Sequence, residues 1–292
     1  MRALMNTREV ADYLRVKERK VYELVSSGRI PCTRVTGKWL FPKSLIDLWV
    51  LENARVPGHT PVTPPPVLAG SHDPLLEWAL VEAGSGLAAL WEGSLQGVRR
   101  LAAGDARACA MHILDAASGV YNAPILERML PGLPVVAVEW CRREQGLIVA
   151  PGNPLGLDSL ADAARHRARF ALRQPESGGR MLLDHLLGQA ELDLAALTVL
   201  EHPARTETDV ASALLDGEAD VGLGIRAVAQ RFRLDFVPLH QERFALAMAR
   251  RDYFEPALQQ LLAFAAGARF REHAEELGGY DVSELGRVVY NA

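Results

Sequence analysis

Short apolar runs alternate with helical segments along most of the chain after residue 66. The runs occupy residues 66–69, 108–111, 135–138, 145–150, 169–172, 221–224, 236–239 and 244–248. Segments with a helical pattern lie between them at residues 75–83, 86–92, 179–189, 208–216 and 256–266. Alternation of strands and helices predicts an α/β fold with mainly parallel sheets.

Two stretches break this alternation, at about residues 135–150 and 236–250. Each is long and strand-rich, with no helical segment between its strands. We interpret them as crossovers between two lobes. Residues 67–292 are therefore predicted to form one two-lobed domain, with the second lobe at about residues 148–236.

Residues 1–55 have another pattern, typical of a small domain. Thr7 is expected to cap a first helix whose apolar stripe is Val10, Ala11 and Leu14. A second helix is expected over residues 17–25. The other expected elements are a β-hairpin with strands at 32–35 and 38–41 and a third helix that starts at Pro42.

A proline-rich segment separates the two patterns. The twelve residues from Arg55 to Pro66 hold five prolines. Such a segment forms neither a helix nor a central strand, and it favours an extended, semi-rigid spacer. We therefore predict a linker at residues 56–66.

Charge is distributed unevenly between the predicted domains. Residues 1–55 hold eleven Lys and Arg against six Asp and Glu, a net charge of +5. The rest of the chain carries a net charge of −9, so the net charge of the whole chain is −4. A small basic domain on an acidic body indicates a nucleic-acid partner for the basic domain alone.

Localisation and cysteine usage follow from composition. The sequence lacks an apolar run of the roughly 18 residues that span a bilayer and lacks a signal-peptide pattern at Met1. We therefore expect a cytoplasmic protein without membrane contact. Cys32, Cys109 and Cys141 lie far apart, without metal-ligand spacing, and are expected to be reduced, with no metal bound.

The clearest candidate for ligand chemistry is the stretch FALRQPESGGRMLL, residues 170–183. A strand is expected to lead into Ser177 and Gly178 at the start of a helix, where free N–H groups and the helix dipole favour an anion. Arg173 and Arg180 flank this turn. Similar serine-glycine turns occur at Ser71 and Ser85, which suggests that the turns converge on one small anionic ligand.

The N-terminal domain resembles the excisionase-type, MerR-like winged helix-turn-helix. The matching segments are MNTREVADYL, KERKVYELVSSGRIP and TRVTGKWLFPKSLIDLW. The resemblance implies that the second helix enters the major groove and that the hairpin lies along the DNA backbone. The DNA contacts it implies are Lys17, Arg19 and Lys20 on the helix, Arg34 and Lys38 on the hairpin, and Lys43. Each could instead be a solvated surface charge.

The C-terminal domain resembles type II periplasmic binding proteins, in the subgroup related to molybdate-binding proteins. Matching segments include AGSHDPLLEWAL, RQPESGGRMLLD and GEADVGLGI. The resemblance implies two lobes that close on a small ligand. The cleft residues expected from it and from the turns are Ser71, Ser85, His112, Asn122, Arg142, Gln145, Arg173, Ser177, Gly178, Arg180 and Thr208.

Several of these residues have structural alternatives. His112 could be a hydrogen-bonded core histidine, and Arg142 could belong to a surface salt-bridge cluster. Ser85 and Thr208 could simply cap helices. Arg173 and Arg180 are expected to repel each other unless an anion lies between them, or unless Glu176 bridges them.

The motifs argue against catalysis. A Walker A sequence, a G-x-S-x-G elbow and an HExxH pair are all missing from the sequence. Residues 221–224 contain part of a glycine pattern, but the third glycine and the ribose-binding acid are missing. We therefore predict a protein that is not an enzyme and holds no cofactor.

These observations favour a ligand-responsive transcriptional regulator. The partners are then double-stranded DNA, a small anion and a second copy of the chain, because one small DNA-binding domain makes few contacts. Molybdate or tungstate is the first expectation for the anion. A carboxylate, phosphate or molybdenum-cofactor-like anion suits the arginines equally well. The alternative is a DNA-architectural or recombination accessory protein that takes no ligand.

Overall fold

The computed structural model describes residues 4–35, 37–53 and 63–292, with side chains omitted for residues 51–53. The chain divides into two compact units, Met1–Val62 and Thr63–Ala292. Most of the predicted linker, residues 56–62, and the turn residue Thr36 lie outside the described residues. Among the helices that are described, none is long and apolar enough to cross a membrane.

The N-terminal unit packs short helices against a small antiparallel sheet. Its strands β1 (Leu4–Asn6), β3 (Lys38–Pro42) and β2 (Thr33–Val35) lie in that order. The helices are α1 (Thr7–Leu14), α2 (Glu18–Ser26) and α3 (Lys43–Asn53). The two strands of the predicted hairpin do pair, with Arg34 opposite Trp39. The core is formed by Met5, Val10, Ala11, Val21, Ile30, Phe41 and Ile46.

Two predicted helix starts in this unit were wrong by one residue. Asn6, and not Thr7, is the N-cap of α1, because its side chain accepts a hydrogen bond from the Glu9 N–H. The Glu9 carboxylate in turn accepts from the Asn6 N–H at 2.8 Å, which completes a capping box. Helix α3 begins at Lys43, one residue after Pro42, because Pro42 is the last residue of β3.

A long mixed sheet runs through the C-terminal unit, which confirms the predicted α/β, two-lobed class. Among the described residues the strands lie in the order β11 (Thr198–Val199), β10 (Arg169–Ala171), β12 (Val221–Ile225), β9 (Val135–Val149), β13 (Asp235–Ala249), β6 (Ala108–Met111), β4 (Val67–Gly70) and β5 (Ala88–Trp91). The outer strands of each half are parallel, while β9 and β13 pair antiparallel with each other and with their neighbours. The expectation of mainly parallel pairing therefore holds at the two ends of the sheet and fails in its centre.

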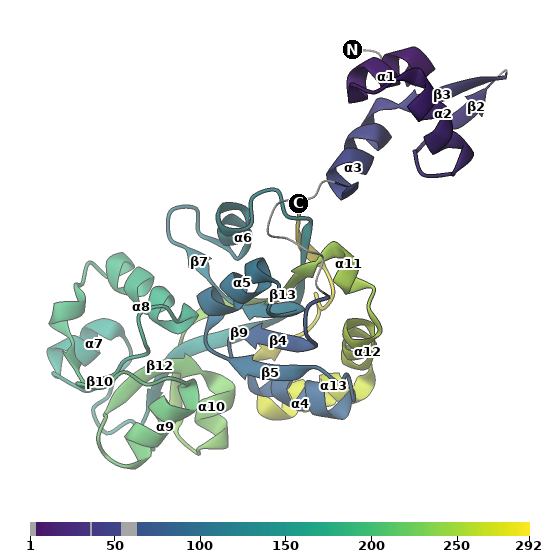
Figure 1. Ribbon diagram of the computed structural model, residues 1–292. Coiled ribbons are helices and arrows are strands. Elements are labelled where there is room, and N and C mark those ends of the chain that lie inside the picture. The colour runs from purple at the N-terminus through teal and green to yellow at the C-terminus, as the bar shows by residue number, and fades with distance from the viewer. Residues whose placement is uncertain (1–3, 36, 54–62) are drawn as a thin grey trace. The chain divides into compact units, whose positions relative to one another are not determined.

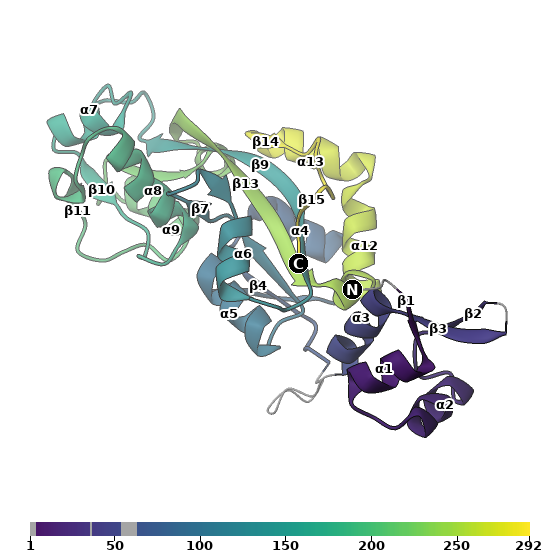
Figure 2. The ribbon, with the colours of Figure 1, turned by 90° about the horizontal axis from the view of Figure 1, so that it is seen from above.

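The two lobes share the strands β9 (Val135–Val149) and β13 (Asp235–Ala249). Each predicted crossover, read from the sequence as separate strands, is one continuous 15-residue strand. Figure 2 shows β9 and β13 running side by side from one lobe into the other. Register shifts in their pairing occur between Pro238 and His240 and between Phe244 and Ala245.

The first lobe is built from two segments of the chain, one that precedes the second lobe in the sequence and one that follows it (Figure 1). Its N-terminal segment contains β4 (Val67–Gly70), α4 (Pro74–Glu82), β5 (Ala88–Trp91), α5 (Ser94–Ala103), β6 (Ala108–Met111), β7 (Leu114–Asp115), β8 (Val120–Tyr121) and α6 (Ala123–Met129). Its C-terminal segment contains α11 (Arg250–Tyr253), α12 (Pro256–Ala265), α13 (Ala268–Leu277), β14 (Tyr280–Asp281) and β15 (Val288–Asn291).

The second lobe lies between β9 and β13 in the sequence. It contains α7 (Leu160–Arg165), β10 (Arg169–Ala171), α8 (Gly178–Gln189), a 3₁₀ turn (Leu194–Ala196), β11 (Thr198–Val199), α9 (Glu207–Leu215), β12 (Val221–Ile225) and α10 (Arg226–Arg231). Separate hydrophobic clusters pack around the two halves of the sheet. Each lobe therefore has a core of its own.

The helix expected at residues 86–92 was wrong. Residues 88–91 form β5, whose Ala88 and Leu90 pair in parallel with Val67 and Ala69 of β4. Gly86 before it has a φ of +71°, a backbone conformation that glycine adopts readily. The true helix α5 begins at Ser94. Ser85 therefore caps no helix, and its hydroxyl accepts a hydrogen bond from the Leu87 N–H instead.

Candidate ligand-binding site

A polar cavity lies between the two lobes of the C-terminal unit. Its free volume is about 10 Å³, roughly room for one water molecule, and one side of it opens to solvent. The first lobe contributes loop residues that follow β4, β5 and β6, and the second lobe contributes residues that follow β10 and begin α9. The lining residues are Ser71, His72, Trp91, Gly93, His112, Arg173, Arg205, Thr206 and Glu207.

On the first lobe, serine hydroxyls and His112 form one connected wall. The Ser71 and Ser94 Oγ atoms are 2.7 Å apart, and Ser94 Oγ accepts a hydrogen bond from the His112 N–H at 3.2 Å. Helix α5 can place Ser94 there because Gly97 packs directly on β4. A Cβ at Gly97 would lie 2.6 Å from Gly70 Cα.

The helices α5, α8 and α9 all begin at this interface between the lobes. Ser177 is the N-cap of α8, and the next residue, Gly178, lies so close to His112 that a Cβ would be 2.7 Å from the imidazole. Thr206 is the N-cap of α9, in a capping box with Asp209. First-turn N–H groups of a helix have no partner within the helix. The interface is therefore rich in backbone donors and favours a negative charge.

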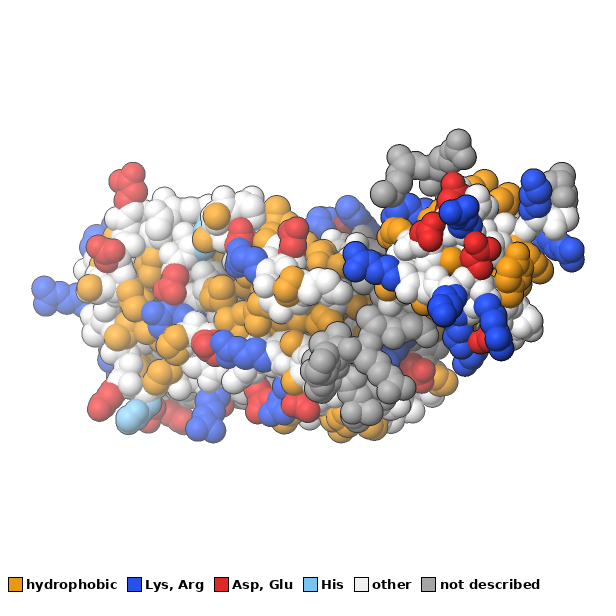
Figure 3. Space-filling view, turned by 45° about the horizontal axis from the view of Figure 1, so that its top comes forward, with side chains coloured by type: hydrophobic (Ala, Val, Ile, Leu, Met, Phe, Trp, Pro, Cys, Tyr) orange, Lys and Arg blue, Asp and Glu red, His pale blue; other side chains and the backbone are white. Residues whose placement is uncertain are grey.

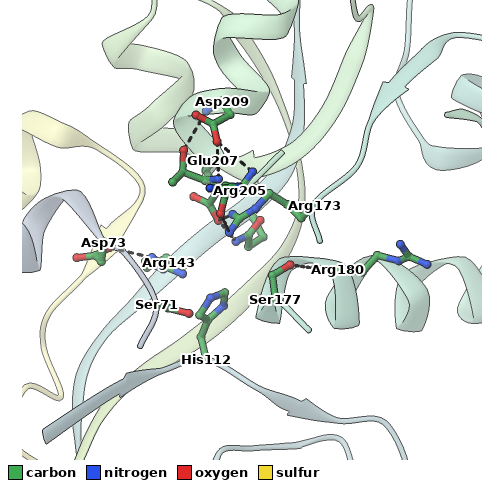
Figure 4. A network of polar contacts seen from close by, with 12 residues as sticks. Ser71, Asp73, His112, Arg143, Arg173, Ser177, Arg180, Arg205, Glu207 and Asp209 are labelled. Atoms are coloured by element: carbon green, nitrogen blue, oxygen red, sulfur yellow. Dashed lines mark hydrogen bonds and ion pairs between the residues drawn. The ribbon is translucent and has the colours of Figure 1, made fainter. Parts of the chain in front are cut away.

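Arg173 brings a buried positive charge to the cavity (Figure 4). Its side chain is 13% exposed, and its Nη2 donates to the Arg205 carbonyl oxygen at 2.9 Å. Its Nε atom is buried without a hydrogen-bond partner among the described residues. Burial lowers the pKa of Arg173, and the Glu207 carboxylate, 3.9 Å from Nη1, opposes that shift. A bound anion would satisfy both the charge and the free N–H.

A buried network of charges supports the cavity from the crossover strands. Arg143 of β9 is 1% exposed, and its guanidinium donates to Asp73 at 2.9 Å and to Glu242 of β13. Glu242 also accepts from His112 Nδ1 at 2.8 Å. Burial alone would raise the pKa of Glu242, but Arg143 and His112 outweigh burial and lower that pKa to about 2. An ionised Glu242 thus fixes the His112 ring.

Comparison with known proteins identifies this fold. A family model described as "PBP superfamily domain" matches residues 79–266. The chain belongs to the PBP superfamily. A model described as "Helix-turn-helix domain" matches residues 4–54, within the N-terminal unit. We therefore call the C-terminal unit the PBP domain and the N-terminal unit the helix-turn-helix domain.

Individual relatives are distant from this chain. It is 28% identical to the uncharacterized protein YvgK of Bacillus subtilis (strain 168) over 199 residues, 68% of this chain and 64% of YvgK. The chain thus spans less than two thirds of that relative's length.

Among solved structures, the tungstate ABC transporter from Geobacter sulfurreducens is similar with a TM-score of 0.53. It is 15% identical and covers 72% of this chain and 97% of its own. PEB3 bound to L-phospholactate has a TM-score of 0.52, with 14% identity over 73% of this chain and 98% of its own. These structures share the fold of the PBP domain.

The structure brings some of the predicted ligand residues together. Ser71, His112 and Arg173 line the cavity, and Ser177 and Gly178 lie beside His112. Gln145 lies just behind this group, where its Nε2 donates to Glu207 at 3.1 Å and to Glu242 at 3.0 Å.

Other predicted ligand residues lie elsewhere. Arg180 forms an ion pair with Asp184, one turn along α8, at 2.9 Å, and Figure 4 shows its side chain directed away from Arg173. Arg142 donates to Glu284 at 2.7 Å. The expectation that an anion or Glu176 bridges the two arginines therefore fails, because Glu176 pairs with Arg99 instead.

Asn122, Ser85 and Thr208 have local structural positions. Asn122 accepts from the Ile113 N–H at 2.8 Å and donates to the Arg243 carbonyl oxygen at 3.3 Å. Ser85 is buried in the loop before β5, away from the residues that line the cavity. The expectation that Thr208 caps its helix was wrong. Thr206 is the N-cap, and Thr208 lies inside α9.

Much of the second-lobe wall consists of residues that were not predicted from the sequence. Arg205, Thr206 and Glu207 all line the cavity. Thr206 followed three residues later by Asp209 is a recognisable cap signal that would have placed the helix start correctly. The signal for Arg205 is weaker, because it lies in a loop whose path depends on tertiary structure.

The predicted DNA-contacting residues fall into three groups in the helix-turn-helix domain. Lys17 is the N-cap residue of α2, and Arg19 and Lys20 on the first turn both lie near Glu23, at 3.5 and 3.0 Å. On the hairpin, the Arg34 guanidinium lies 5.3 Å from the centre of the Trp39 ring. Lys38 is exposed at the start of β3. Figure 3 shows the basic side chains of this domain interspersed with acidic ones.

Lys43 differs from the other predicted DNA contacts because it has strong internal partners. Its Nζ lies 2.6 Å from Asp47 Oδ2 and 3.2 Å from the Tyr13 hydroxyl. The hydrogen bond to Asp47 raises the pKa of Lys43. A phosphate contact by Lys43 would have to compete with this pair.

Proposed function

We propose that this protein is a DNA-binding regulator of transcription whose affinity for DNA responds to a small anion. The observation that carries the proposal is a helix-turn-helix domain in the same chain as a PBP domain that has a donor-rich cavity. We also propose that it binds its ligand without catalysing a reaction and that it acts in the cytoplasm.

The anion would bind between the lobes. Arg173 supplies a buried charge with a free Nε–H within the described part of the chain, and the N-termini of α5, α8 and α9 supply backbone donors. Molybdate or tungstate is the first candidate on the family resemblance. Carboxylates, phosphate and a molybdenum-cofactor-like anion are alternatives. Two structural neighbours are a tungstate ABC transporter and PEB3 bound to L-phospholactate, but at such low identity these neighbours do not choose among the candidates.

Ligand response requires two arrangements of the lobes with different affinities for the anion. Contacts already join the lobes across the cavity. Arg99 of α5 donates two hydrogen bonds to Glu176 before α8, at 2.9 and 3.1 Å, and Gly178 packs on His112. An anion bound by both lobes would add further contacts of this kind and would favour the closed arrangement.

The DNA-binding part of the proposal follows the excisionase-type, MerR-like resemblance. Helix α2 would enter the major groove with Lys17, Arg19 and Lys20, while Arg34 and Lys38 would contact the backbone from the hairpin. Two copies of the chain would bind one operator, because a single small domain buries little surface on DNA.

A panel of anions tests the ligand part. The melting temperature of the full chain is measured with molybdate, tungstate, sulfate, phosphate and small carboxylates. One or two of these anions should raise the melting temperature clearly, since a ligand at 100 times its Kd adds about 2.7 kcal/mol of stability. If none has an effect while the protein still binds DNA, the architectural alternative is supported instead.

A further inference from the structure

One residue in the cavity has the wrong chemistry for a simple anion site. Glu207, the first residue of α9, is 6% exposed and lines the cavity together with Arg173 and the backbone donors. An ionised carboxylate accepts hydrogen bonds and donates none. The cavity therefore offers a negative acceptor among its donors.

The hydrogen bonds of Glu207 occupy one of its two oxygens. Oε1 accepts from Gln145 Nε2 at 3.1 Å and lies 3.9 Å from Arg173 Nη1, which is beyond hydrogen-bonding distance. Among the described residues none donates a hydrogen bond to Oε2, which remains open to solvent in the cavity.

Such a carboxylate discriminates between anions that are otherwise alike. An anion whose oxygens all lack hydrogen would satisfy the donors but would place a negative oxygen near Oε2, which would then lose contact with solvent without gaining a donor. An anion that also carries an O–H can donate it to Oε2. Sites built around such a hydrogen bond reject analogues that cannot make it by large factors.

We propose that Glu207 sets the specificity of the cavity, and that the cavity selects small anions that carry a hydrogen-bond donor. The proposal rests on the proposed function, because it assumes that the cavity binds an anion. Phosphate, which keeps a proton at neutral pH, and 2-hydroxy acids belong to the selected class. Sulfate, molybdate, tungstate and simple carboxylates belong to the rejected class, so the inference favours phosphate or a hydroxy acid over the molybdate or tungstate that the family resemblance puts first.

Matched pairs of anions test the proposal on the full wild-type chain. Calorimetric affinities are measured for phosphate against sulfate and for glycolate against acetate, with molybdate and tungstate added. The donor-bearing member of at least one pair should bind about 100-fold more tightly than its partner. A preference confined to phosphate or to glycolate identifies which of the two chemistries the cavity takes.

Substitution of the carboxylate provides a second, independent test. In Glu207→Gln the amide supplies a donor, so sulfate or acetate should gain affinity and the preference should fall to less than about tenfold. Glu218→Gln is the control, because Glu218 is exposed at the far end of the same lobe segment, and it should keep the wild-type preference. The circular dichroism spectrum shows whether each variant is folded.

Two results would contradict this proposal, and they have different consequences for the proposed function. If neither pair shows a preference for its donor-bearing member, or if molybdate or tungstate binds the wild-type chain more tightly than both phosphate and glycolate, the role of Glu207 is refuted while the anion sensor stands. If no anion of the panel binds, both this inference and the ligand part of the proposed function are refuted.

Discussion

At the scale of single residues, the cavity depends on a few buried charges with unequal roles. Arg173 is close to the lining donors and has a free Nε–H among the described atoms, whereas Arg180, seven residues later, is turned toward Asp184. The two arginines look alike in the sequence. Their surroundings in the fold separate a charge that lines the cavity, Arg173, from one that belongs to an ordinary pair along a helix, Arg180.

This difference gives a direct prediction for two alanine variants. Arg173→Ala should weaken binding of the stabilising anion by about 10-fold to 100-fold, because hydrogen bonds to charged groups contribute about 1.5–3 kcal/mol. Arg180→Ala should leave that affinity within about threefold of wild type, because it removes only a pair at a helix surface. Calorimetric titration measures both. Equal losses in the two variants would contradict the placement of the site.

Glu242 gives a prediction about pH. Its pKa is about 2 in the folded protein against about 4.3 for an ordinary glutamate. A depressed pKa stabilises the fold fully above the unfolded value, and this stability is lost as the pH falls through about 4 toward 2. The melting temperature of the PBP domain should therefore decrease over that range.

The same pH series on Glu242→Gln provides the comparison. The variant should be destabilised at pH 7 by roughly 3–5 kcal/mol, because it removes a partner of the buried Arg143 charge. Its melting temperature should also depend less on pH below 4. If wild type and variant lost stability in parallel on acidification, Glu242 would not be the group responsible.

At the scale of elements, local signals in the sequence predicted most helices of the PBP domain. The helices expected at 75–83, 179–189 and 256–266 are α4, α8 and α12, displaced by about one residue. The failure at residues 86–92 has a tertiary cause, since those residues become a strand only by pairing with β4. The direction of Arg180 and the path of the loop to Arg205 also depend on contacts between distant segments. The sequence therefore located only part of the site.

The contact between α5 and the loop before α8 leads to a prediction about closure. Arg99 and Glu176 are both about half exposed, so solvent screens their bridge and it should add little to the stability of the fold. Because it joins the two lobes, Glu176→Gln should lower anion affinity about twofold to fivefold. Titration of the variant with the stabilising anion measures this effect.

The control uses a neighbouring bridge that lies within the first lobe. Arg100, next to Arg99 on α5, pairs with Glu92, and Glu92→Gln should leave anion affinity unchanged. The exchanged pair Arg99→Glu with Glu176→Arg should recover part of the lost affinity. Equal effects of Glu92→Gln and Glu176→Gln would show that the bridge between the lobes has no special role in closure.

At the scale of the whole molecule, a basic DNA-binding unit and an acidic ligand-binding unit share one chain. Residues 1–55 carry a net charge of +5 and the remainder −9, so attraction to DNA should depend on the helix-turn-helix domain. The double variant Lys17→Ala with Lys20→Ala should bind DNA more weakly. It should also reduce the slope of log affinity against log salt by about 2 if both lysines contact phosphates. An unchanged slope would contradict that assignment.

The central claim is that anion binding in the PBP domain changes DNA binding by the same chain. Genomic DNA fragments that the full chain retains in a pull-down serve as the ligand for this test. The affinity of the chain for these fragments is measured with and without the anion that stabilises the protein, in wild type and in Arg173→Ala. The anion should change the DNA affinity of wild type by about fivefold or more and should have little effect on the DNA affinity of the variant. An anion that binds wild type tightly and leaves its DNA affinity unchanged would contradict the central claim.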